Sequence, residues 1–485
     1  MKSVNYCQHG HLGAAMRTKI DDREAQKYLQ GLELEPSLMR QLLNINVVVN
    51  HSRFSITRQL FRGFSQQKPM ESSEIVNARI NAPHVCNTWD NTDNFEYTEE
   101  DFIYQTAPWC DDSPIKLSRF DVELQRQWDI AMNDGVFRYN IGHIVTRILP
   151  GPKHYVAQLN TLRARERRRP QEITSVHQQF NPEDFNFTRV QPKEVIFNLV
   201  NKTETSSATG SQCSRNDYFK NGVPNGYLVC NGKVDAECSS YETKRPERHT
   251  LVVNVSPMEY GHCLLVPQID KLPAQVCILT EVSIQVALET ILLSSHRGLI
   301  MGFNSLCAFA SVNHLHFHLY YLEHELIADH CPVTHLGGKV YEMTAVPCPG
   351  FGMQLHGSTV QKLARLTHRI SDYFIKNEIA HNVFICRGPV FGEDRNSFHT
   401  TVRLFIWPRK KFIGKKSCDE FNVACIELGG HLPIKEEAGY NRMTEEEVDG
   451  IIADACLPDD DPLPYAKIKE EVIRIGIEEN SSSDI

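Results

Sequence analysis

The chain has 485 residues, 41% of them hydrophobic and 23% charged, a balance typical of globular proteins. The length suggests about three domains. A formal net charge of −9 argues against broad binding to nucleic acid or anionic membranes, so an anionic ligand would need a local positive pocket. Because no run of about 18 apolar residues occurs and residues 1–14 lack a signal-peptide core, we expect a cytoplasmic protein without membrane spans.

The 15 cysteines are scattered and include no C-x-x-C pair. We therefore expect most of them to be reduced thiols that fill apolar space, and we expect no zinc site built from them.

In chain order, residues 1–112 are the least legible, and we expect an extension with a loop at 87–101. Apolar residues recur at helical spacing from Leu117 to Ala131, and Gly135 ends that run. Strands are predicted at 136–149, 155–160 and 194–200. Five arginines and one glutamate lie between Arg163 and Arg169. We expect a solvated loop there, with a basic lip near nucleotide phosphates as the functional alternative.

Residues 201–244 are rich in Ser, Thr, Gly and Asn, which predicts a flexible insertion. A hairpin is predicted from 250–256 and 263–266, then a helix with an apolar face from Ile278 to Leu292, then a strand at 299–303. With the strand that follows, these elements make an α+β unit on an antiparallel sheet.

Beyond residue 330, the Gly- and Pro-rich stretch 333–349 is expected to be irregular. A helix is predicted from Val360 to Phe374, and strands at 381–386, 401–407 and 423–428. Thr444 and Glu447 form a capping box before a last pair of helices.

The most informative stretch is residues 314–318, which read His-Leu-His-Phe-His. Alternation with period two is typical of a half-buried strand, which would place His314, His316 and His318 on one face. Such a row can bind a metal, or it can place a nucleophilic imidazole between two helpers. Spacing alone favours neither chemistry, whereas a purely structural role for three histidines on a core strand is the weaker interpretation.

The flanking residues resemble a known family. Residues 254–267 read Asn-Val-Ser-Pro-Met-Glu-Tyr-Gly-His-Cys-Leu-Leu-Val-Pro, and Gly-Phe-Asn-Ser stands at 302–305, before the triad. This arrangement resembles the nucleotidyltransferase branch of the histidine-triad superfamily, and within it the GDP-L-galactose/GDP-D-glucose phosphorylase family. The resemblance implies a bilobal α+β fold of antiparallel sheets with helices, in which two triad-like halves share one chain.

The domain division expected on this basis has five parts. It consists of an extension and linker at 1–112, the first part of the core at 113–200, the insertion at 201–244, the catalytic unit at 245–330, and the second half with C-terminal helices at 331–485.

The resemblance also implies residue roles. His316 would attack the α-phosphorus of GDP-D-glucose and carry a guanylyl group, with His314 and His318 flanking the phosphate. Inorganic phosphate would then release GDP, so GDP-hexose and phosphate are the expected partners, and neither a metal nor a cofactor is required. Polar residues beside the triad are expected to hold phosphate or ribose oxygens or to orient the histidines: Asn304, Ser305, Ser311 and Asn313.

Other interpretations stay open. Plant relatives and uridylyl-transferring cousins usually have Gln where this chain has His318, and His there is also found in triad hydrolases, so a nucleotide hydrolase is one alternative. A zinc-dependent hydrolase with the three histidines as ligands is another, although no H-E-x-x-H is present. A non-catalytic guanine-nucleotide-binding module is a third, against which the complete triad argues.

Four isolated histidines are expected to be surface or core residues: His143, His262, His399 and His431. His262 is the best functional candidate among them because it adjoins the predicted hairpin. The sequence leaves the oligomeric state open, with a homodimer as one option.

Overall fold

The computed structural model describes residues 93–202, 248–271, 279–414, 421–458 and 460–481. These residues belong to a compact unit spanning 85–485. Residues 203–244 of the expected insertion and most of the 1–112 extension lie outside the described residues, and Asn201 is the last residue of a strand. In the described parts of the chain, no helix is long and apolar enough to cross a bilayer.

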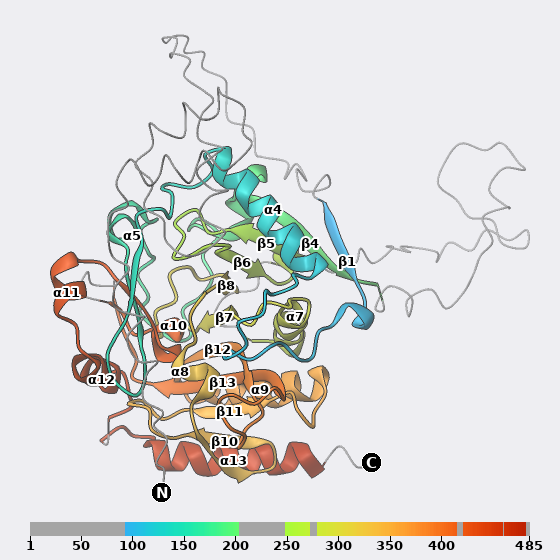
Figure 1. Ribbon diagram of the computed structural model, residues 1–485. Helices are drawn as coiled ribbons and strands as arrows, with labels where there is room; N and C mark the ends of the chain where they lie inside the picture. The colour runs from blue at the N-terminus through green and yellow to red at the C-terminus, as the bar shows by residue number, and fades with distance from the viewer. Residues whose placement is uncertain (1–92, 203–247, 272–278, 415–420, 459, 482–485) are drawn as a thin grey trace, which may run out of the picture. The chain divides into compact units, whose positions relative to one another are not determined.

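An 11-stranded sheet forms the centre of the unit, in the order β1-β4-β5-β6-β8-β7-β12-β13-β11-β10-β9 (Figure 1). Neighbouring strands are antiparallel except for β1 and β4. The strands are β1 (Asn94–Tyr97), β4 (Val195–Asn201), β5 (His249–Val253), β6 (Cys263–Val266), β7 (Leu299–Asn304), β8 (Phe317–Tyr321), β9 (Val333–Gly337), β10 (Val340–Met343), β11 (Phe351–Gln354), β12 (Ala380–Pro389) and β13 (Thr400–Arg409).

A second sheet has three strands in the order β14-β3-β2. Its strands are β2 (Val145–Ile148), β3 (Val156–Leu159) and β14 (His431–Ile434). The α-helices are α4 (Arg119–Asn133), α5 (Thr161–Glu166), α7 (Glu281–Leu292), α8 (Ile327–His330), α9 (Val360–Lys376), α10 (Cys425–Gly429), α11 (Glu437–Arg442), α12 (Glu445–Ala453) and α13 (Tyr465–Ser481).

The large sheet consists of two halves with the same chain order. The first runs β4-β5-β6-α7-β7-β8 and the second β9-β10-β11-α9-β12-β13. Corresponding strands occupy mirrored places on either side of the junction between β7 and β12, where Phe303 pairs with Val383. This arrangement confirms the expected bilobal α+β fold with two triad-like halves.

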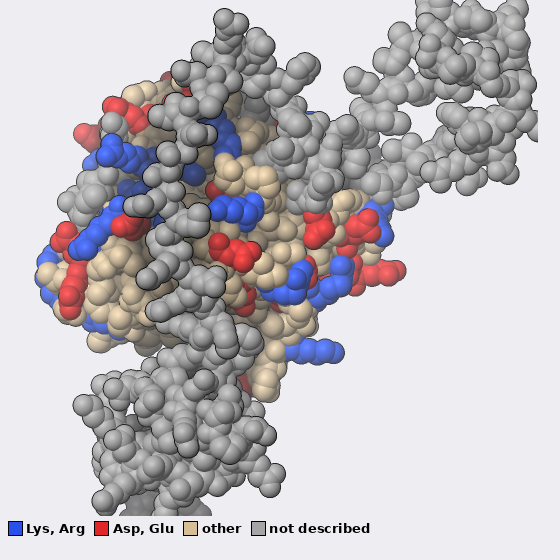
Figure 2. Space-filling model, turned by 90° about the horizontal axis from the view of Figure 1, so that it is seen from above, with Lys and Arg blue, Asp and Glu red and all other residues tan. Residues whose placement is uncertain are grey.

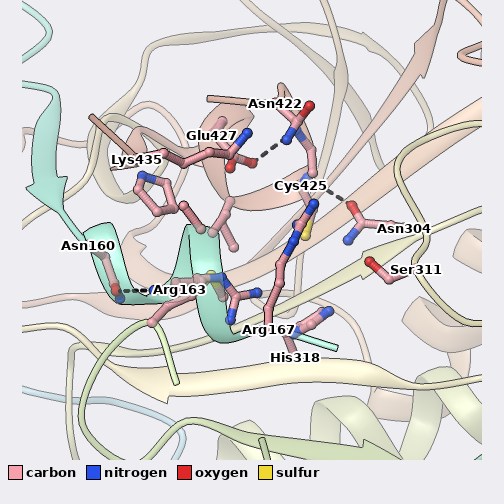
Figure 3. A pocket seen from close by; sticks show the side chains of 15 residues that line it. Asn160, Arg163, Arg167, Asn304, Ser311, His318, Asn422, Cys425, Glu427 and Lys435 are labelled. Carbon is pink, nitrogen blue, oxygen red and sulfur yellow. Dashed lines mark hydrogen bonds between the residues drawn. The ribbon is translucent and has the colours of Figure 1, made fainter. Parts of the chain in front are cut away.

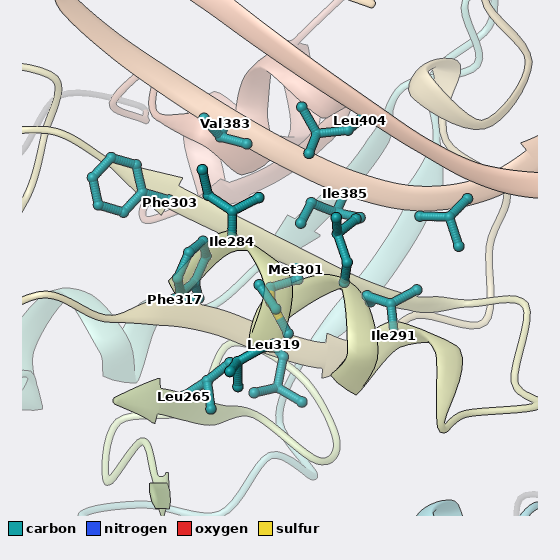
Figure 4. Packing of buried hydrophobic residues seen from close by; sticks show 14 of the residues in the cluster. Leu265, Ile284, Ile291, Met301, Phe303, Phe317, Leu319, Val383, Ile385 and Leu404 are labelled. Atoms are coloured by element: carbon teal, nitrogen blue, oxygen red, sulfur yellow. The ribbon is translucent and has the colours of Figure 1, made fainter. Parts of the chain in front are cut away.

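Each face of the large sheet is covered. On one face, α4, α7, α9 and α13 pack over a core that spans both halves. Figure 4 shows Ile284 and Ile291 of α7 beside Met301, Leu319 and Ile385 from strands of both halves. The small sheet packs with α8, α10 and α12 in a second core that includes Tyr320 and Phe384. The two halves are thus joined by continuous hydrogen bonding and by shared apolar packing.

Most predicted elements are confirmed. The helix that follows Leu117 is α4, and the helix from Val360 to Phe374 is α9 with its apolar face buried. The hairpin is β5 and β6, the strand at 299–303 is β7, and the capping box of Thr444 and Glu447 opens α12. Strands β3, β4, β12 and β13 also lie where strands were predicted.

Several predictions are wrong. The loop at 87–101 contains β1, whose residues alternate between exposed and buried. Only the last residues of the strand predicted at 136–149 form one, β2, because an Asx turn at Asn140 and Gly142 interrupts the chain. The stretch at 333–349 is not irregular throughout, since β9 and β10 form a hairpin there with a left-handed turn residue at Gly338.

Two further predictions fail for local reasons. The apolar run at 423–428 contains helix α10 instead of a strand, and Gly430 ends it with a left-handed φ of 109°. The arginine-rich stretch from Arg163 is not a loop at its start, because the Asn160 side chain accepts a hydrogen bond from Arg163 N at 3.0 Å and caps α5.

Candidate active site

The histidine triad straddles the start of strand β8. Only His318 lies within the strand, where it pairs with Leu264 of β6 and Gly302 of β7. His314 and His316 precede β8, so the prediction of one strand through all three is wrong. The residues before Phe317 leave the sheet because they bond to the segment at 171–190.

His316 is held in one tautomer by its own backbone. Its Nδ1 lies 2.7 Å from the carbonyl oxygen of His314, and the ring is buried. Since a carbonyl oxygen can only accept, Nδ1 carries the proton and Nε2 carries the lone pair. An imidazole in this tautomer can react only through Nε2.

His314 is neutral and fully buried. Burial lowers the pKa of His314 to about 3, and the electrostatic effect of nearby His316 is a second, smaller cause in the same direction. Its Nδ1 accepts a hydrogen bond from Phe187 N at 3.0 Å, so its proton sits on Nε2, which is buried and makes no hydrogen bond. The Phe187 ring also packs against His316, with centroids 4.9 Å apart. These contacts fix the position of the backbone carbonyl that orients His316.

His318 is coupled to a fourth histidine, His262, which stands just before β6. The Nδ1 of His262 accepts from Met258 N at 2.9 Å, so its proton lies on Nε2. That Nε2 is 3.1 Å from Nδ1 of His318. His262 thus donates to His318, whose own proton must lie on Nε2. Burial holds the pKa of His262 well below its usual range, which keeps it neutral.

A directed chain of hydrogen bonds runs beneath the triad. Tyr320 donates to His431 Nδ1 at 2.6 Å, and His431 Nε2 donates to Gln158 Oε1 at 2.6 Å. Gln158 then donates to Glu259 at 2.5 Å, beside Met258. Burial lowers the pKa of His431 to about 3, so the ring stays neutral. The chain joins the small sheet to the hairpin that positions His262.

The segment at 171–190 is tied to the residues before β8. The side chain of Asn313 donates to the carbonyls of Gln178 and Gln179 at 2.9 and 3.1 Å. Gln171 accepts from Asn313 N at 2.7 Å and donates through its own backbone to Ser311 O at 3.0 Å. Asn313 therefore anchors this segment beside the triad.

A cavity opens next to His318, between α5, α10 and the ends of β7 and β14 (Figure 3). Its lining includes Arg163, Arg167 and Lys435, with Glu427 as the acidic member. The remaining lining residues are Asn160, Ala164, Met258, Asn304, Ser311, Asn422, Ala424, Cys425, Ile426 and Pro433. This concentration of cations gives the acidic chain the local positive pocket that an anionic ligand requires.

The cationic lining is local. Figure 2 shows Lys and Arg side chains interspersed with Asp and Glu over the visible face. In the cavity, Arg163 also donates to the carbonyl oxygen of Ser256, which ties α5 to the hairpin before His262. Arg163 and Arg167 therefore line a cavity and do not belong to a solvated loop, while a place near nucleotide phosphates stays a prediction.

Asn304 forms one wall of the cavity. Its Oδ1 accepts from Asn382 Nδ2 at 2.6 Å and from Cys425 N at 2.9 Å. This leaves its amide nitrogen on the side of Ser311 and His318 (Figure 3). A Cβ atom at Gly302 would lie 2.5 Å from Cys425 Sγ, so glycine permits α10 to approach the sheet this closely.

Of the expected site residues apart from His314 and His316, three line the cavity and two do not. Asn304, Ser311 and His318 line the cavity. Ser305 is fully buried, and its hydroxyl accepts from His381 N at 2.9 Å and donates to Leu306 O. Asn313 points its side chain at the 171–190 segment instead of the cavity.

Sequence reasoning left some residues of the site without a role. The position of His262 beside the predicted hairpin, with one residue between it and Leu-Leu-Val-Pro, was the one available signal for it. His143 and His399 carry no such role: His143 bonds Asn140 O and Asn160 Oδ1, and His399 pairs with Glu393 at 2.6 Å. Among the described residues, no three His, Cys, Asp or Glu side chains are arranged to hold a metal ion.

Comparison with solved structures finds distant similarity. The crystal structure of yeast Ap4A phosphorylase Apa2 in complex with Ap4A has 13% sequence identity and a TM-score of 0.44, over 71% of this chain and 99% of that one.

Comparison with sequences gives stronger matches. GDP-D-glucose phosphorylase 1 of Danio rerio is 37% identical over 78% of this chain and 98% of its own length. The Homo sapiens protein of that name is 35% identical over 75% and 88%, and GDP-L-galactose phosphorylase 2 of Arabidopsis thaliana is 27% identical over 73% and 79%. Two family models, GDPGP1-like N-terminal domain and GDPGP1-like C-terminal domain, match residues 119–223 with 218–320 and residues 322–476. The chain therefore belongs to the GDPGP1-like family.

Proposed function

We propose that this protein is a GDP-hexose phosphorylase, a nucleotidyltransferase that converts GDP-D-glucose and inorganic phosphate to glucose 1-phosphate and GDP. The observation that carries the proposal is the 2.7 Å contact between His316 Nδ1 and His314 O, which leaves the lone pair on Nε2. The names of the relatives supply the substrate class.

In the first step, Nε2 of His316 attacks the α-phosphorus of the GDP-hexose. A P–N bond forms, and the bond to the bridging oxygen breaks so that hexose 1-phosphate leaves with the electron pair. Because hexose 1-phosphate is a stable anion, it needs no proton to depart. As Nε2 becomes bonded to phosphorus, the imidazolium charge is stabilised at Nδ1 by the His314 carbonyl.

In the second step, an oxygen of inorganic phosphate attacks the same phosphorus. The P–N bond breaks, GDP forms, and His316 regains its neutral tautomer. Splitting one displacement into two lowers each barrier and restores the enzyme.

The surrounding groups bind the phosphates. The proton on His318 Nε2, fixed by His262, is placed to donate to an α-phosphate oxygen, and Arg163 and Arg167 supply charge in the cavity beside it. Asn304 and Ser311 are placed to contact the phosphate or ribose. Ser305 and Asn313 act indirectly, through the position of neighbouring backbone.

One observation argues against the zinc hydrolase. Its three imidazoles would share one ion, yet His314 Nδ1 accepts from Phe187 N, so Nε2 carries the proton and neither nitrogen of this ring has a lone pair for a metal. A nucleotide hydrolase would use the same nucleophile with water as the acceptor. A product assay with GDP-glucose distinguishes it: phosphorolysis yields glucose 1-phosphate and GDP and stops without phosphate, whereas hydrolysis yields GMP and continues.

A further inference from the structure

Two cysteines outside the active site lie in contact. Cys348 stands in the loop between β10 and β11, and Cys456 follows α12. The thiol of Cys456 donates to the carbonyl oxygen of Pro347, the neighbour of Cys348, at 3.4 Å, and Cys456 packs against the apolar cluster that contains Cys348. Both are free cysteines, so the contact is between thiols and not a disulfide.

The two thiols differ in burial and in charge. Cys348 is fully buried in the second core, whereas Cys456 is partly exposed. The nearby Cys348 thiol lowers the pKa of Cys456, and the Arg409 guanidinium adds to this effect. The pKa of Cys348 is raised well above its usual value by the same contact and by burial. The more exposed Cys456 is thus suited to react first with an oxidant, and the buried Cys348 to react afterwards with the oxidised Cys456.

A cavity of about 750 Å³ is lined by residues that stand close in the chain to both cysteines, and also by Cys331. One wall is formed by Ala345, Val346 and Pro347, immediately before Cys348. The opposite wall includes Gly450 and Ala453, and Ala453 lies one helical turn before Cys456. A small oxidant can therefore reach the segments that carry both thiols.

We propose that Cys348 and Cys456 form a reversible disulfide when the protein meets a peroxide. The Cys456 thiolate attacks one peroxide oxygen, an S–O bond forms, the O–O bond breaks, and water leaves after protonation. The Cys348 sulfur then attacks the sulfenic acid, an S–S bond forms, and a second water leaves with the Cys348 proton. Each sulfur loses one electron, and the peroxide gains two.

Arg409 connects the pair to the wall of the active-site cavity. Arg409 faces both thiols and donates to Asn382 Oδ1 at 3.2 Å and to the carbonyl of Val423. Asn382 in turn donates to Asn304 in the cavity wall. The disulfide would join the β10–β11 loop to the end of α12, close to this network.

The test uses the full chain, reduced and then treated with hydrogen peroxide, followed by alkylation and non-reducing peptide mapping. We expect one cross-linked peptide pair joining Cys348 to Cys456, lighter by two hydrogens and separated again by dithiothreitol. Cys456→Ser should abolish it, and the exposed-site control Cys110→Ser should retain it. In Cys348→Ser, the sulfenic acid at Cys456 should persist and be trapped by dimedone.

Three results would overturn the proposal. They are a Cys456 oxidised to sulfinic acid while Cys348 still alkylates, a Cys456 linked to another cysteine, and a Cys456 that stays reduced while Cys110 reacts. If Cys348→Ser does not fold, the wild-type map and Cys456→Ser decide the question, since Cys456 is not in the core. No readout depends on turnover, so the result is independent of the proposed activity.

Discussion

The Nε2 atom of His262 lies 3.1 Å from Nδ1 of His318, across two paired strands. Because Met258 N occupies the other nitrogen of His262, the proton between the rings belongs to His262. The consequence is a His318 whose own proton lies on Nε2. A histidine outside the H-x-H-x-H motif thus sets the tautomer of one inside it.

Substitution of His262 tests this coupling. His262→Asn keeps an acceptor for Met258 N but is too short to reach His318, whereas His262→Gln can place an amide nitrogen near the lost Nε2. We expect His262→Asn to lower kcat by roughly 10-fold or more and His262→Gln to retain more activity. Steady-state kinetics with GDP-glucose measures both. Equal activity of the two variants would show that the hydrogen bond to His318 is unimportant, and His335→Asn on exposed β9 is the control.

Two arginines of one stretch provide a matched pair. Arg167 lines the cavity, and Arg165, on the same short segment, is exposed. We expect Arg167→Gln to raise KM for GDP-glucose by about 10-fold, because a charge-assisted contact to phosphate is lost, and Arg165→Gln to change it little. Equal shifts of KM in the two variants would show that the effect comes from the loss of one positive charge on the protein and not from a contact in the cavity.

The residue at 318 is expected to influence the choice of acceptor. Since hexose 1-phosphate leaves without a proton, His318→Gln, which keeps an N–H donor, should preserve phosphorolysis to within about 10-fold. Glutamine does not exchange protons near neutral pH, so GMP release in the absence of phosphate should fall. Chromatography of products with and without phosphate measures the ratio. A rise in GMP formation would contradict this role.

Buried neutral histidines make stability depend on pH. Burial lowers the pKa of His381 to about 4, from 6.5. As the pH falls below 6.5, His381 becomes protonated in the unfolded chain but not in the folded protein. The contribution of neutral His381 to the free energy of unfolding is therefore complete above pH 6.5 and decreases by about 1.4 kcal/mol per pH unit toward pH 4. Urea unfolding at pH 7.5 and 5 should therefore show a smaller pH dependence for His381→Gln than for the wild type. An unchanged dependence would contradict the shift, and His335→Gln should behave like the wild type.

The sequence predicted those parts of the fold whose patterns are local. The apolar stripe of α9 follows directly from burial of one face, and the apolar runs of β12 and β13 follow from burial of both faces of these strands. The run at 423–428 was misread because a short apolar stretch satisfies either period. In the structure it contains helix α10, whose Cys425 packs closely against Gly302. The start of β8 was misplaced because its departure from the sheet depends on bonds to residues more than a hundred positions away.

In the candidate site, too, local sequence patterns could be predicted and tertiary contacts could not. The triad itself was visible in the sequence because its histidines are adjacent. Arg167, His262 and His431 approach it only through tertiary contacts of α5, the β5–β6 hairpin and β14. No periodicity reports such contacts, since each depends on how separate elements pack. For the same reason, Ser305 was expected near phosphate, although its hydroxyl bonds within the fold.

The central claim is that His316 carries the guanylyl group. Protein incubated with GDP-glucose and no phosphate, then quenched rapidly in base, should gain the mass of one guanylyl group, located at His316 by peptide sequencing. Phosphate should discharge it as GDP, and acid should cleave it, as expected for a phosphoramidate. His316→Ala should fold, form no adduct and not turn over. Turnover of GDP-glucose by the wild type with no adduct at His316 on any quench timescale would contradict the covalent route.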